Sequence, residues 1–564
     1  MSFIGEFPDP DPLWRDIEAA TRADETARVD ALLMEIPLDG KGRRRIAKTA
    51  RRLVEKIRRR GVGQGGLDAL LHEYELSNQE GVVLMCLAEA LLRVPDAETA
   101  NRLIRDKLAE ADWEGHLGHS ESWFVNASTW ALMLTGRFVK LDVETLGDAP
   151  SLLRRLVARS GEPVLREAMK RAMRIIGRQF VMGRTIGEAL DRAGEGEARG
   201  YRHSYDMLGE AARTAADAED YFNAYADAIG AIGAISAGRG VIDGPGVSIK
   251  LSGLHPRYEF GQRHRVINEL VPRLLELVRR AMEAGVGVCI DAEEAERLGL
   301  SLEVIGAVFG DQRLAGWEGL GLAVQAYQKR APLVIDWLAD LARRHGRRLM
   351  VRLVKGAYWD AEIKRAQELG LDGFPVFSRK VCTDVSFIAC AARLLAARDA
   401  IYPMFATHNA QTLATVLELA GEYRDFEFQR LHGMGESLYD HVADGFDIPC
   451  RVYAPVGGYR ELLAYLVRRL LENGANTSFV NRLVDEALPI DEVIADPIAE
   501  ATALASKPHP RIPLPAALYG GERRNSKGVD LSDPAALRPL AEAMTAAHGP
   551  WRAVGGSLEE RPVL

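Results

Sequence analysis

Several features that are common in secreted and membrane proteins are missing from this sequence of 564 residues. It has five cysteines, widely scattered and without C-x-x-C spacing, so neither a disulfide framework nor a structural zinc site is expected. No H-x-x-x-H motif suggests another metal site. No apolar run approaches the roughly 20 residues of a membrane span. The first residues lack the basic start and apolar core of a signal peptide, so a cytoplasmic protein with buried thiols is expected.

Excess positive charge is also missing, because the formal net charge is −8, which argues against a general polyanion binder. Residues 41–60 are the exception, with eleven Lys or Arg. Ile46, Ala50, Leu53 and Ile57 recur there at helical spacing, which predicts an amphipathic helix with a solvated basic face. DNA binding by this segment is the alternative, but no aromatic residues are interleaved to support it.

The pattern of apolar residues changes along the chain. It is helical to about residue 190, and from about residue 201 short apolar runs alternate with amphipathic stretches, as in a parallel βα array. The eight runs begin at His203, Val247, Val286, Leu322, Leu349, Pro403, Phe426 and Arg451. An open doubly wound sheet is the alternative, but no G-x-G-x-x-G follows any run, and eight is the number of strands in a closed barrel.

The sequence therefore predicts an α/β protein whose TIM-like (β/α)8 barrel follows an all-helical arm and a helical domain. The predicted limits are 1–60 for the arm, 61–195 for the helical domain and 196–505 for the barrel. Residues 506–564 contain a proline-rich linker and the beginning of a further unit.

Polar side chains follow the apolar runs at their ends. They are Lys250, Asp291, Gln325, Arg352 with Lys355, His408 and Tyr453. One such residue is ordinarily a loop residue, but the ends of parallel strands converge on one face of a barrel, where βα loops build active sites. Six converging positions predict an active site there.

A second polar cluster is expected on a helix near the end of the barrel. Tyr465, Arg468, Arg469 and Glu472 are spaced i, i+3, i+4 and i+7 and share one face. An exposed salt-bridged face is the alternative, but the surrounding leucines leave little of the helix for solvent. Adjacent guanidiniums suit a carboxylate or phosphate, and Lys250 could complete a pocket of three cations.

Longer segments resemble a known family. They are 250–258 (KLSGLHPRY), 352–360 (RLVKGAYWD), 405–409 (FATHN), 431–436 (LHGMGE), 453–456 (YAPV), 462–473 (LLAYLVRRLLEN) and, in the helical region, 76–90 (LSNQEGVVLMCLAEA). In this order they closely resemble the proline dehydrogenase half of the bifunctional bacterial proline utilisation A proteins. The resemblance covers nearly the whole chain.

The resemblance implies roles in substrate binding. Arg468, Arg469 and Lys250 would hold the carboxylate of L-proline, and Glu210 would pair with Arg468 in the absence of substrate. Asp291 would face the substrate amine and count, with Arg352, among the catalytic residues. Leu431 and Tyr453 would wall the ring, and Tyr465 is a further substrate-binding residue.

The resemblance also implies an FAD site. Arg352 would lie beside flavin N5, where positive charge favours the reduced anionic flavin, and Gln325 would bond to the flavin ring. The remaining contacts implied are Ala292, Val354, Lys355, Gly356, Ala357, Trp359, Lys380, Thr407, His408 and Glu472. Gly356 would allow close approach of the backbone.

The implied reaction is the first step of proline catabolism to glutamate. Proline would be clamped by its carboxylate, and a hydride would pass from its C5 to flavin N5, giving Δ1-pyrroline-5-carboxylate. No metal is required. In this family the electrons pass to a membrane quinone, which implies peripheral contact with the inner face of the membrane.

Two modules of the larger family members are not expected in this chain. Too little sequence precedes the helical arm for a ribbon-helix-helix repressor domain, so binding of nucleic acid is not expected. Residues 518–530 (LYGGERRNSKGVD) resemble the beginning of the family's aldehyde dehydrogenase half, but the chain ends at Leu564. Cys450 is the last cysteine, so no later thiol could attack an aldehyde, and we expect a truncated chain without that second activity.

A Schiff-base aldolase is the rival enzyme hypothesis, because Lys250 and Lys355 both stand at predicted strand ends.

Overall fold

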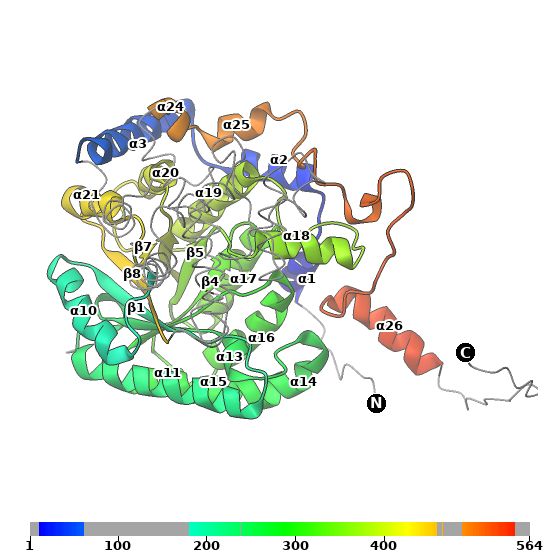
Figure 1. The fold of residues 1–564 in the computed structure, drawn as a ribbon, viewed down its shortest axis with the longest axis horizontal. Coiled ribbons are helices and arrows are strands. Elements are labelled where there is room, and N and C mark those ends of the chain that lie inside the picture. Colours follow the sequence, from blue (N-terminus) through cyan, green and yellow to red (C-terminus); the bar gives the residue numbers. More distant parts are fainter. Residues whose placement is uncertain (1–10, 61–179, 237, 459–464, 466–487, 548–564) are drawn as a thin grey trace, which may run out of the picture.

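A computed structural model describes residues 11–60, 180–236, 238–458, 465 and 488–547. Eight parallel strands follow one another around a closed barrel, and β8 pairs with β1 to close it (Figure 1). The strands are β1 (Arg202–Met207), β2 (Gly246–Ile249), β3 (Gly287–Ile290), β4 (Leu320–Gln325), β5 (Leu349–Val354), β6 (Ile401–Ala406), β7 (Glu427–Leu431) and β8 (Cys450–Val456). The predicted TIM-like barrel is confirmed.

Helices surround the barrel and bury the outer faces of the strands. They are α11 (Ala215–Ser236), α15 (Val271–Glu283), α16 (Leu298–Phe309), α17 (Ala331–Arg344), α18 (Trp359–Glu368), α19 (Lys380–Ala396), α20 (Ala410–Ala420) and α21 (Glu436–Phe446). Because the strands are covered on both sides, β4 and β5 are largely apolar and all six residues of β4 are buried, whereas β1 and β7 carry several buried polar residues.

Shorter elements lie in the connections between strands and helices. They are α12 (Gly240–Asp243), α13 (Leu251–Leu254), η1 (Phe260–Gln262), α14 (Arg263–Arg265), η2 (Val266–Leu270), η3 (Ala295–Arg297) and η4 (Gln312–Leu314). The helix α10 (Ile186–Ala198) precedes β1 and contacts it.

The N-terminal arm consists of α1 (Pro12–Ala19), α2 (Glu25–Glu35) and α3 (Gly40–Arg60), which pack on α17, α19 and α20. The amphipathic helix predicted for residues 41–60 is confirmed, because Ile46 and Leu53 are buried against the barrel. Several of its arginines bind barrel-side carboxylates: Arg45 pairs with Glu418, and Arg43 lies 2.5 Å from Asp496. These contacts dock the helix on the barrel.

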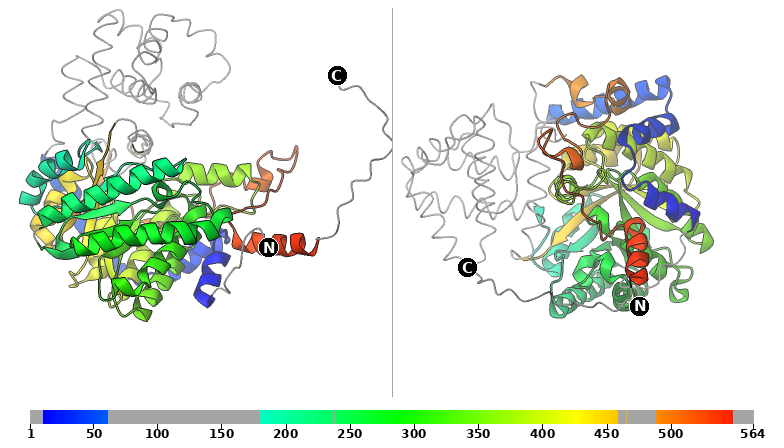
Figure 2. Two further views of the ribbon diagram at one scale, coloured as in Figure 1. Left: turned by 90° about the horizontal axis from the view of Figure 1, so that it is seen from below. Right: turned by 90° about the vertical axis from the view of Figure 1, so that its right-hand side faces the viewer.

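The described C-terminal segment returns to the arm. It contains α24 (Ile490–Val493), α25 (Pro497–Ala503), η5 (Pro515–Ala517) and α26 (Pro534–Ala546). In Figure 2, α26 lies at the same edge of the barrel as the arm, where Arg538 pairs with Glu18 at 3.2 Å. Leu537 of α26 is fully buried.

The barrel strands all fall inside the predicted range of 196–505. The domain limits themselves stay a prediction, since the helical domain expected at 61–195 falls largely outside the described residues. Within the described ranges, no helix has both the length and the apolar character needed to cross a bilayer.

Candidate active site

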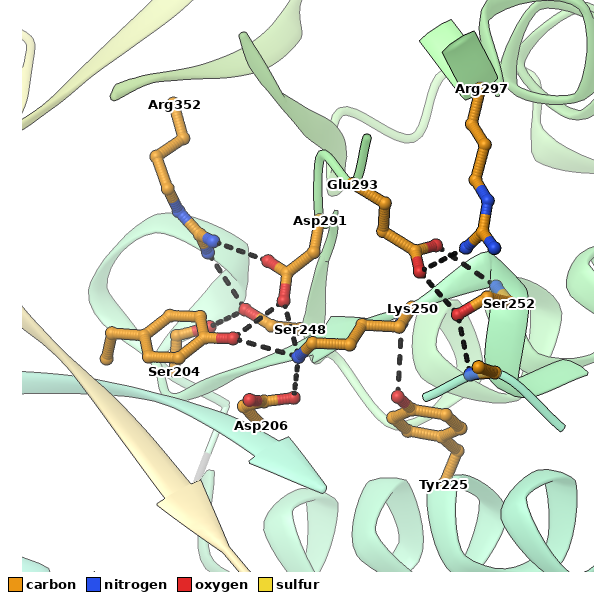
Figure 3. A network of polar contacts seen from close by, with 12 residues as sticks. Ser204, Asp206, Tyr225, Ser248, Lys250, Ser252, Asp291, Glu293, Arg297 and Arg352 are labelled. Atoms are coloured by element: carbon orange, nitrogen blue, oxygen red, sulfur yellow. Dashed lines mark hydrogen bonds and ion pairs between the residues drawn. The ribbon is translucent and has the colours of Figure 1, made fainter. Parts of the chain in front are cut away.

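The strand-end side chains predicted from the sequence meet at the carboxyl end of the barrel. Ile249 pairs with Ile290 as the last matched residues of β2 and β3, so Lys250 and Asp291 leave the two strands side by side. Arg352 of β5 and Tyr453 of β8 reach the same place from across the barrel. Figure 3 shows Lys250 between Asp206 and Asp291, with Arg352 on the other side of Asp291.

Lys250 is buried and fully engaged. Its Nζ lies 2.6 Å from Oδ1 of Asp206, 2.9 Å from Oδ2 of Asp291 and 3.2 Å from the hydroxyl of Tyr453. Its backbone N–H donates to the hydroxyl of Tyr225 at 3.1 Å. Three oxygens therefore surround an ammonium group that has three N–H donors.

Asp291 is the centre of the cluster. Nη1 of Arg352 donates to its Oδ1 at 2.8 Å, and the hydroxyl of Tyr453 donates to its Oδ2 at 2.6 Å. Nη2 of Arg352 donates to Ser248 at 2.9 Å, and its guanidinium lies 5.2 Å from the ring centroid of Tyr453. These contacts fix the side chains of Asp291 and Arg352.

The protonation states follow from burial and from the neighbouring charges. Burial alone would raise the pKa of Asp291, but Lys250 and Arg352 outweigh it and hold the pKa below its ordinary value. Burial alone would lower the pKa of Lys250, but the surrounding oxygens of Asp206, Tyr453 and Asp291 hold it well above the ordinary value. Burial and the two carboxylates raise the pKa of Tyr453 well above that of free tyrosine. At neutral pH the ammonium is charged and the phenol keeps its proton.

The cluster is balanced in charge, since Asp206 and Asp291 face Lys250 and Arg352. Lys250 was predicted to be one of three cations for the substrate carboxylate, but its ammonium is already held by two carboxylates. It could bind a third only by exchanging one of these contacts. Further positive charge for an anion would have to come from outside the cluster.

Asp206 is the residue that the sequence reasoning missed. It lies in β1, is completely buried and makes the shortest contact of Lys250. Burial is the main cause of its raised pKa. The available signal was a carboxylate inside an otherwise buried strand, because such a group is rarely placed there without a charged partner.

Three of the residues predicted on the last helix, Arg468, Arg469 and Glu472, lie outside the described residues. Tyr465 is described and buried. Glu210 is half-buried in the loop after β1, and its predicted pairing with Arg468 stays a prediction.

The predicted FAD residues are distributed over the same end of the barrel. Gln325 ends β4 and accepts a hydrogen bond from Gln328 at 2.8 Å. His408 follows β6, and its Nε2 accepts from the backbone N–H of Leu431 at 3.1 Å. Thr407, just before it, is buried and accepts from the N–H of Asn409 at 3.1 Å.

The loop after β5 contributes the next group of predicted FAD residues. Val354 ends that strand, and Gly356 and Ala357 are exposed beyond it. Gly356 has a φ of 134°, and an added Cβ would lie 2.5 Å from the ring of Tyr327, so only glycine fits. Trp359 begins α18, and its indole N–H donates to the carbonyl of Phe377 at 2.8 Å.

Two observations fit a large anionic cofactor at this end of the barrel. Nε of Arg352 is buried and has no hydrogen-bond partner among the described residues, so a donor is available beside the cluster. Lys355 and Lys380 flank Asp384 at 2.5 and 2.9 Å near the start of α19, which brings two ammonium groups together there. A bound diphosphate suits such a group of lysines.

A small cleft opens beside Asp291. Its walls are formed by the ends of β3 and β4 and the start of α16, and they include Ala292, Glu293, Arg297 and Gln325. Three residues predicted for substrate or cofactor binding thus line one cleft: Asp291, Ala292 and Gln325.

Comparison with protein families gives this arrangement a context. The family model described as "Proline dehydrogenase" matches residues 189–482, just over half of the chain and the whole of the barrel. The chain belongs to the proline dehydrogenase family. Two further models match the preceding region: "Proline utilization A proline dehydrogenase N-terminal domain" at 11–58 and "DNA-binding domain of Proline dehydrogenase" at 66–180. The match at 66–180 falls almost entirely outside the described residues. Our expectation that the chain does not bind nucleic acid therefore stays a prediction.

Among individual proteins, the chain is 52% identical to the bifunctional protein PutA of Klebsiella aerogenes over 97% of its own length and 43% of that protein. It is 28% identical to the proline dehydrogenase of Deinococcus radiodurans, over 56% of this chain and 93% of that protein. The chain therefore spans about two fifths of the PutA protein it resembles.

A crystal structure of the D779W mutant of Bradyrhizobium japonicum proline utilization A has a similar fold. The TM-score is 0.75 and the identity 49%, over 96% of this chain and 54% of that one. The recognition made from the sequence segments is thus confirmed.

Proposed function

We propose that this chain catalyses the FAD-dependent oxidation of L-proline to Δ1-pyrroline-5-carboxylate. The observation that carries the proposal is the buried cluster of Asp206, Lys250, Asp291, Arg352 and Tyr453, which lies at the carboxyl end of a barrel of this family. Active sites of such barrels are built at that end.

In this proposal the cluster orients the substrate. Lys250 and Arg352 hold Asp291 in one position as a carboxylate, and Tyr453 donates to it. The fixed carboxylate would face the amine of proline. Neutral proline would give up a hydride from C5 to the bound acceptor as its nitrogen lone pair forms the new C=N bond, and the iminium so formed would release its N–H proton to water. Fixed geometry supplies much of the catalysis in such a step.

The cluster itself is neutral, so the substrate carboxylate needs another cation. We propose Arg468 and Arg469 for this role, with Leu431 and Tyr453 walling the ring and Tyr465 as a further substrate-binding residue, as the family resemblance implies.

We propose that the cofactor is held by Arg352, Gln325 and the lysine pair of Lys355 and Lys380, with further contacts from the loop after β5 and from His408. The buried Nε of Arg352, which has no hydrogen-bond partner among the described residues, and the two lysines on either side of Asp384 support this assignment. When bound, FAD would supply the acceptor for the hydride at its N5 atom.

The Schiff-base hypothesis is disfavoured by the state of Lys250. A Schiff-base lysine attacks as the neutral amine, whereas the oxygens of Asp206, Tyr453 and Asp291 hold the pKa of Lys250 well above its ordinary value.

A quinone as the later electron acceptor, and contact with the inner face of the membrane, rest on the family resemblance alone. The second activity of the PutA proteins is not proposed for this chain.

The absorption spectrum of the purified protein, before and after anaerobic addition of L-proline, tests the proposed function. We expect a yellow protein whose flavin absorption is bleached by proline. A colourless protein that borohydride and a carbonyl substrate label at Lys250 would support the aldolase instead.

A further inference from the structure

A second polar pair continues the line of contacts between the ends of β2 and β3. Lys250 and Asp291 form the first pair. Two residues further along each segment, Glu293 accepts the backbone N–H of Ser252 at 3.1 Å and also the Ser252 hydroxyl. The two pairs lie next to each other in Figure 3.

Glu293 is a buried carboxylate with no part in the proposed chemistry. Its other partner is Arg297, at 3.1 Å, and Glu294 and the ring of Tyr258 also lie near this group of charges. Burial raises the pKa of Glu293 to about 7, against the lowering effects of Arg297 and Ser252. Burial in this place disfavours the charged form of the Glu293 carboxyl group.

Ser252 extends the contact to a third segment. Its hydroxyl accepts the backbone N–H of Ala211 at 2.9 Å, and its carbonyl accepts that of Ala212 at 2.9 Å. Ala211 has a φ of 54°, which is strained for a residue with a side chain. The loops after β1 and β3 are therefore both tied to α13 at Ser252.

The segment from Asp291 to Glu294 has no regular secondary structure. Its position depends on individual bonds: the N–H of Asp291 donates to the carbonyl of Ile249 at 2.9 Å, and Glu293 binds Ser252. Asp291 has only one residue between it and Glu293. A shift of Glu293 would therefore move the carboxylate that Lys250 and Arg352 hold.

We propose that the Ser252–Glu293 pair is a positioning element that fixes Asp291 at the active site and ties the loop after β3 to the loop after β1. The proposal rests on the proposed function for its catalytic consequence. The contacts themselves are independent of that function.

The test compares Glu293→Ala, Ser252→Ala and the double variant with the wild-type protein. We expect the proline concentration for half-maximal flavin bleaching to rise roughly 10- to 100-fold in Glu293→Ala, because small displacements of a reacting geometry have effects of this size. The double variant should need no higher proline concentration than the more affected single variant, because both substitutions remove the same Ser252–Glu293 contact. Glu293→Gln keeps an acceptor oxygen and should restore most of the affinity.

The control is Glu303→Ala, which removes a partly buried carboxylate from α16. Glu303 pairs with Arg263 at 2.6 Å, a contact that does not involve the loop after β3. If Glu293 only stabilised the fold, both variants would lose thermal stability and neither would change the proline titration.

Amide hydrogen exchange gives a readout that does not depend on activity. In Glu293→Ala we expect faster exchange of the peptides that contain Ala211 and Asp291, with unchanged exchange in α11. Unchanged exchange at Ala211 and Asp291 would overturn the positioning role even if proline bleaches the flavin. A wild-type protein that proline does not bleach would overturn the proposed function, and the exchange result would still decide whether the pair holds Asp291.

Discussion

Buried charges occupy both ends of the barrel, and the two groups are built differently. At the amino end, Arg451 of β8 bonds to Glu427 of β7 through Nε at 2.7 Å and through Nη2 at 3.0 Å. Backbone carbonyls take its remaining donors, including Gly244 at 2.8 Å. Glu427 is completely buried.

At the carboxyl end, four charged side chains and Tyr453 share their contacts, and one hydrogen-bond donor of this cluster is unused in the part of the chain that the structure describes. Lys250 is held between two carboxylates, Asp291 between two cations, and Nε of Arg352 has no partner among the described residues. A cleft opens beside Asp291. The comparison teaches that buried charge alone does not mark an active site. Shared charges, an unused donor and an adjacent cleft do.

The largest effect is expected when the carboxyl-end cluster loses its shared cation. Lys250→Met leaves two buried carboxylates without the cation between them, so Asp291 loses one of its two cations. We expect proline-dependent flavin bleaching to slow by roughly 100- to 1,000-fold, a usual effect of removing a preorganised charge. Lys364→Met, an exposed lysine of α18, is the control and should leave the rate unchanged. A normal bleaching rate in Lys250→Met would contradict the proposed role of the carboxyl-end cluster in the reaction.

At the amino end the corresponding change should affect stability. Glu427→Gln leaves Arg451 without a counter-charge in a buried site, which costs about 3–5 kcal/mol of unfolding free energy. Urea unfolding measures this loss, and the proline titration of the folded protein should not change. Glu418→Gln removes a surface partner of Arg45 and should change the unfolding free energy little, because exposed ion pairs contribute little to stability. Altered proline affinity in Glu427→Gln would show that the two ends are coupled.

A smaller effect is expected from Asp206→Asn. The amide can still accept from Lys250, but the cluster gains a net positive charge and Lys250 is held less firmly. We expect the bleaching rate to fall about tenfold, which corresponds to the loss of one charged hydrogen bond of about 1.5 kcal/mol. Thermal unfolding should shift little, because burial of this carboxylate is itself unfavourable. A large loss of thermal stability with an unchanged bleaching rate would mean that Asp206, like Glu427 at the amino end, serves stability and not the reaction.

The smallest effect concerns Glu362 of α18, which accepts the N–H of Ala295 at 2.7 Å. Burial, with Glu294 and Glu296 nearby and Arg330 opposing, raises its pKa from 4.5 to about 7. The folded state therefore binds this proton more tightly than the unfolded chain, and the stability so gained is present below about pH 4.5 and lost as the pH rises through 7.

The amide side chain of the Glu362→Gln variant cannot ionise. The difference in thermal unfolding midpoint between this variant and the wild type should therefore shift in favour of the variant from pH 5 to pH 8, on the order of a few degrees. Differential scanning calorimetry at both pH values measures this. Glu368→Gln, exposed on the same helix, should show no such trend. A difference that is constant with pH would mean that Glu362 does not titrate in this interval.

Much of the fold could be predicted because its signals are local. The eight apolar runs gave the strands, and the spacing of Ile46 and Leu53 gave α3. Lys250 and Asp291 were predicted to converge on one face of the barrel with the other strand-end side chains, and the register of β2 and β3 places them side by side there. The residues proposed for the cofactor stay predictions, although the structure brings many of them to the same end of the barrel.

Other features could not be read from local patterns. Asp206 looked like one more polar residue of a short strand, and nothing nearby in the sequence identified Lys250 as its partner. Arg22 binds Asp530 at 2.9 Å across more than five hundred residues of chain. The approach of Glu293 to Ser252 likewise depends on how two loops settle beside each other.

The sequence by itself determined the barrel, the amphipathic basic helix and the convergence of functional side chains, because periodicity and strand polarity are encoded residue by residue. Only the tertiary structure decided that Lys250 is shared by two carboxylates, that Asp291 is held by two cations and that Ser252 of α13 ties the loops after β1 and β3 together. The energy of buried charges depends on which distant groups fold beside them, and this is fixed only when the chain closes into the barrel.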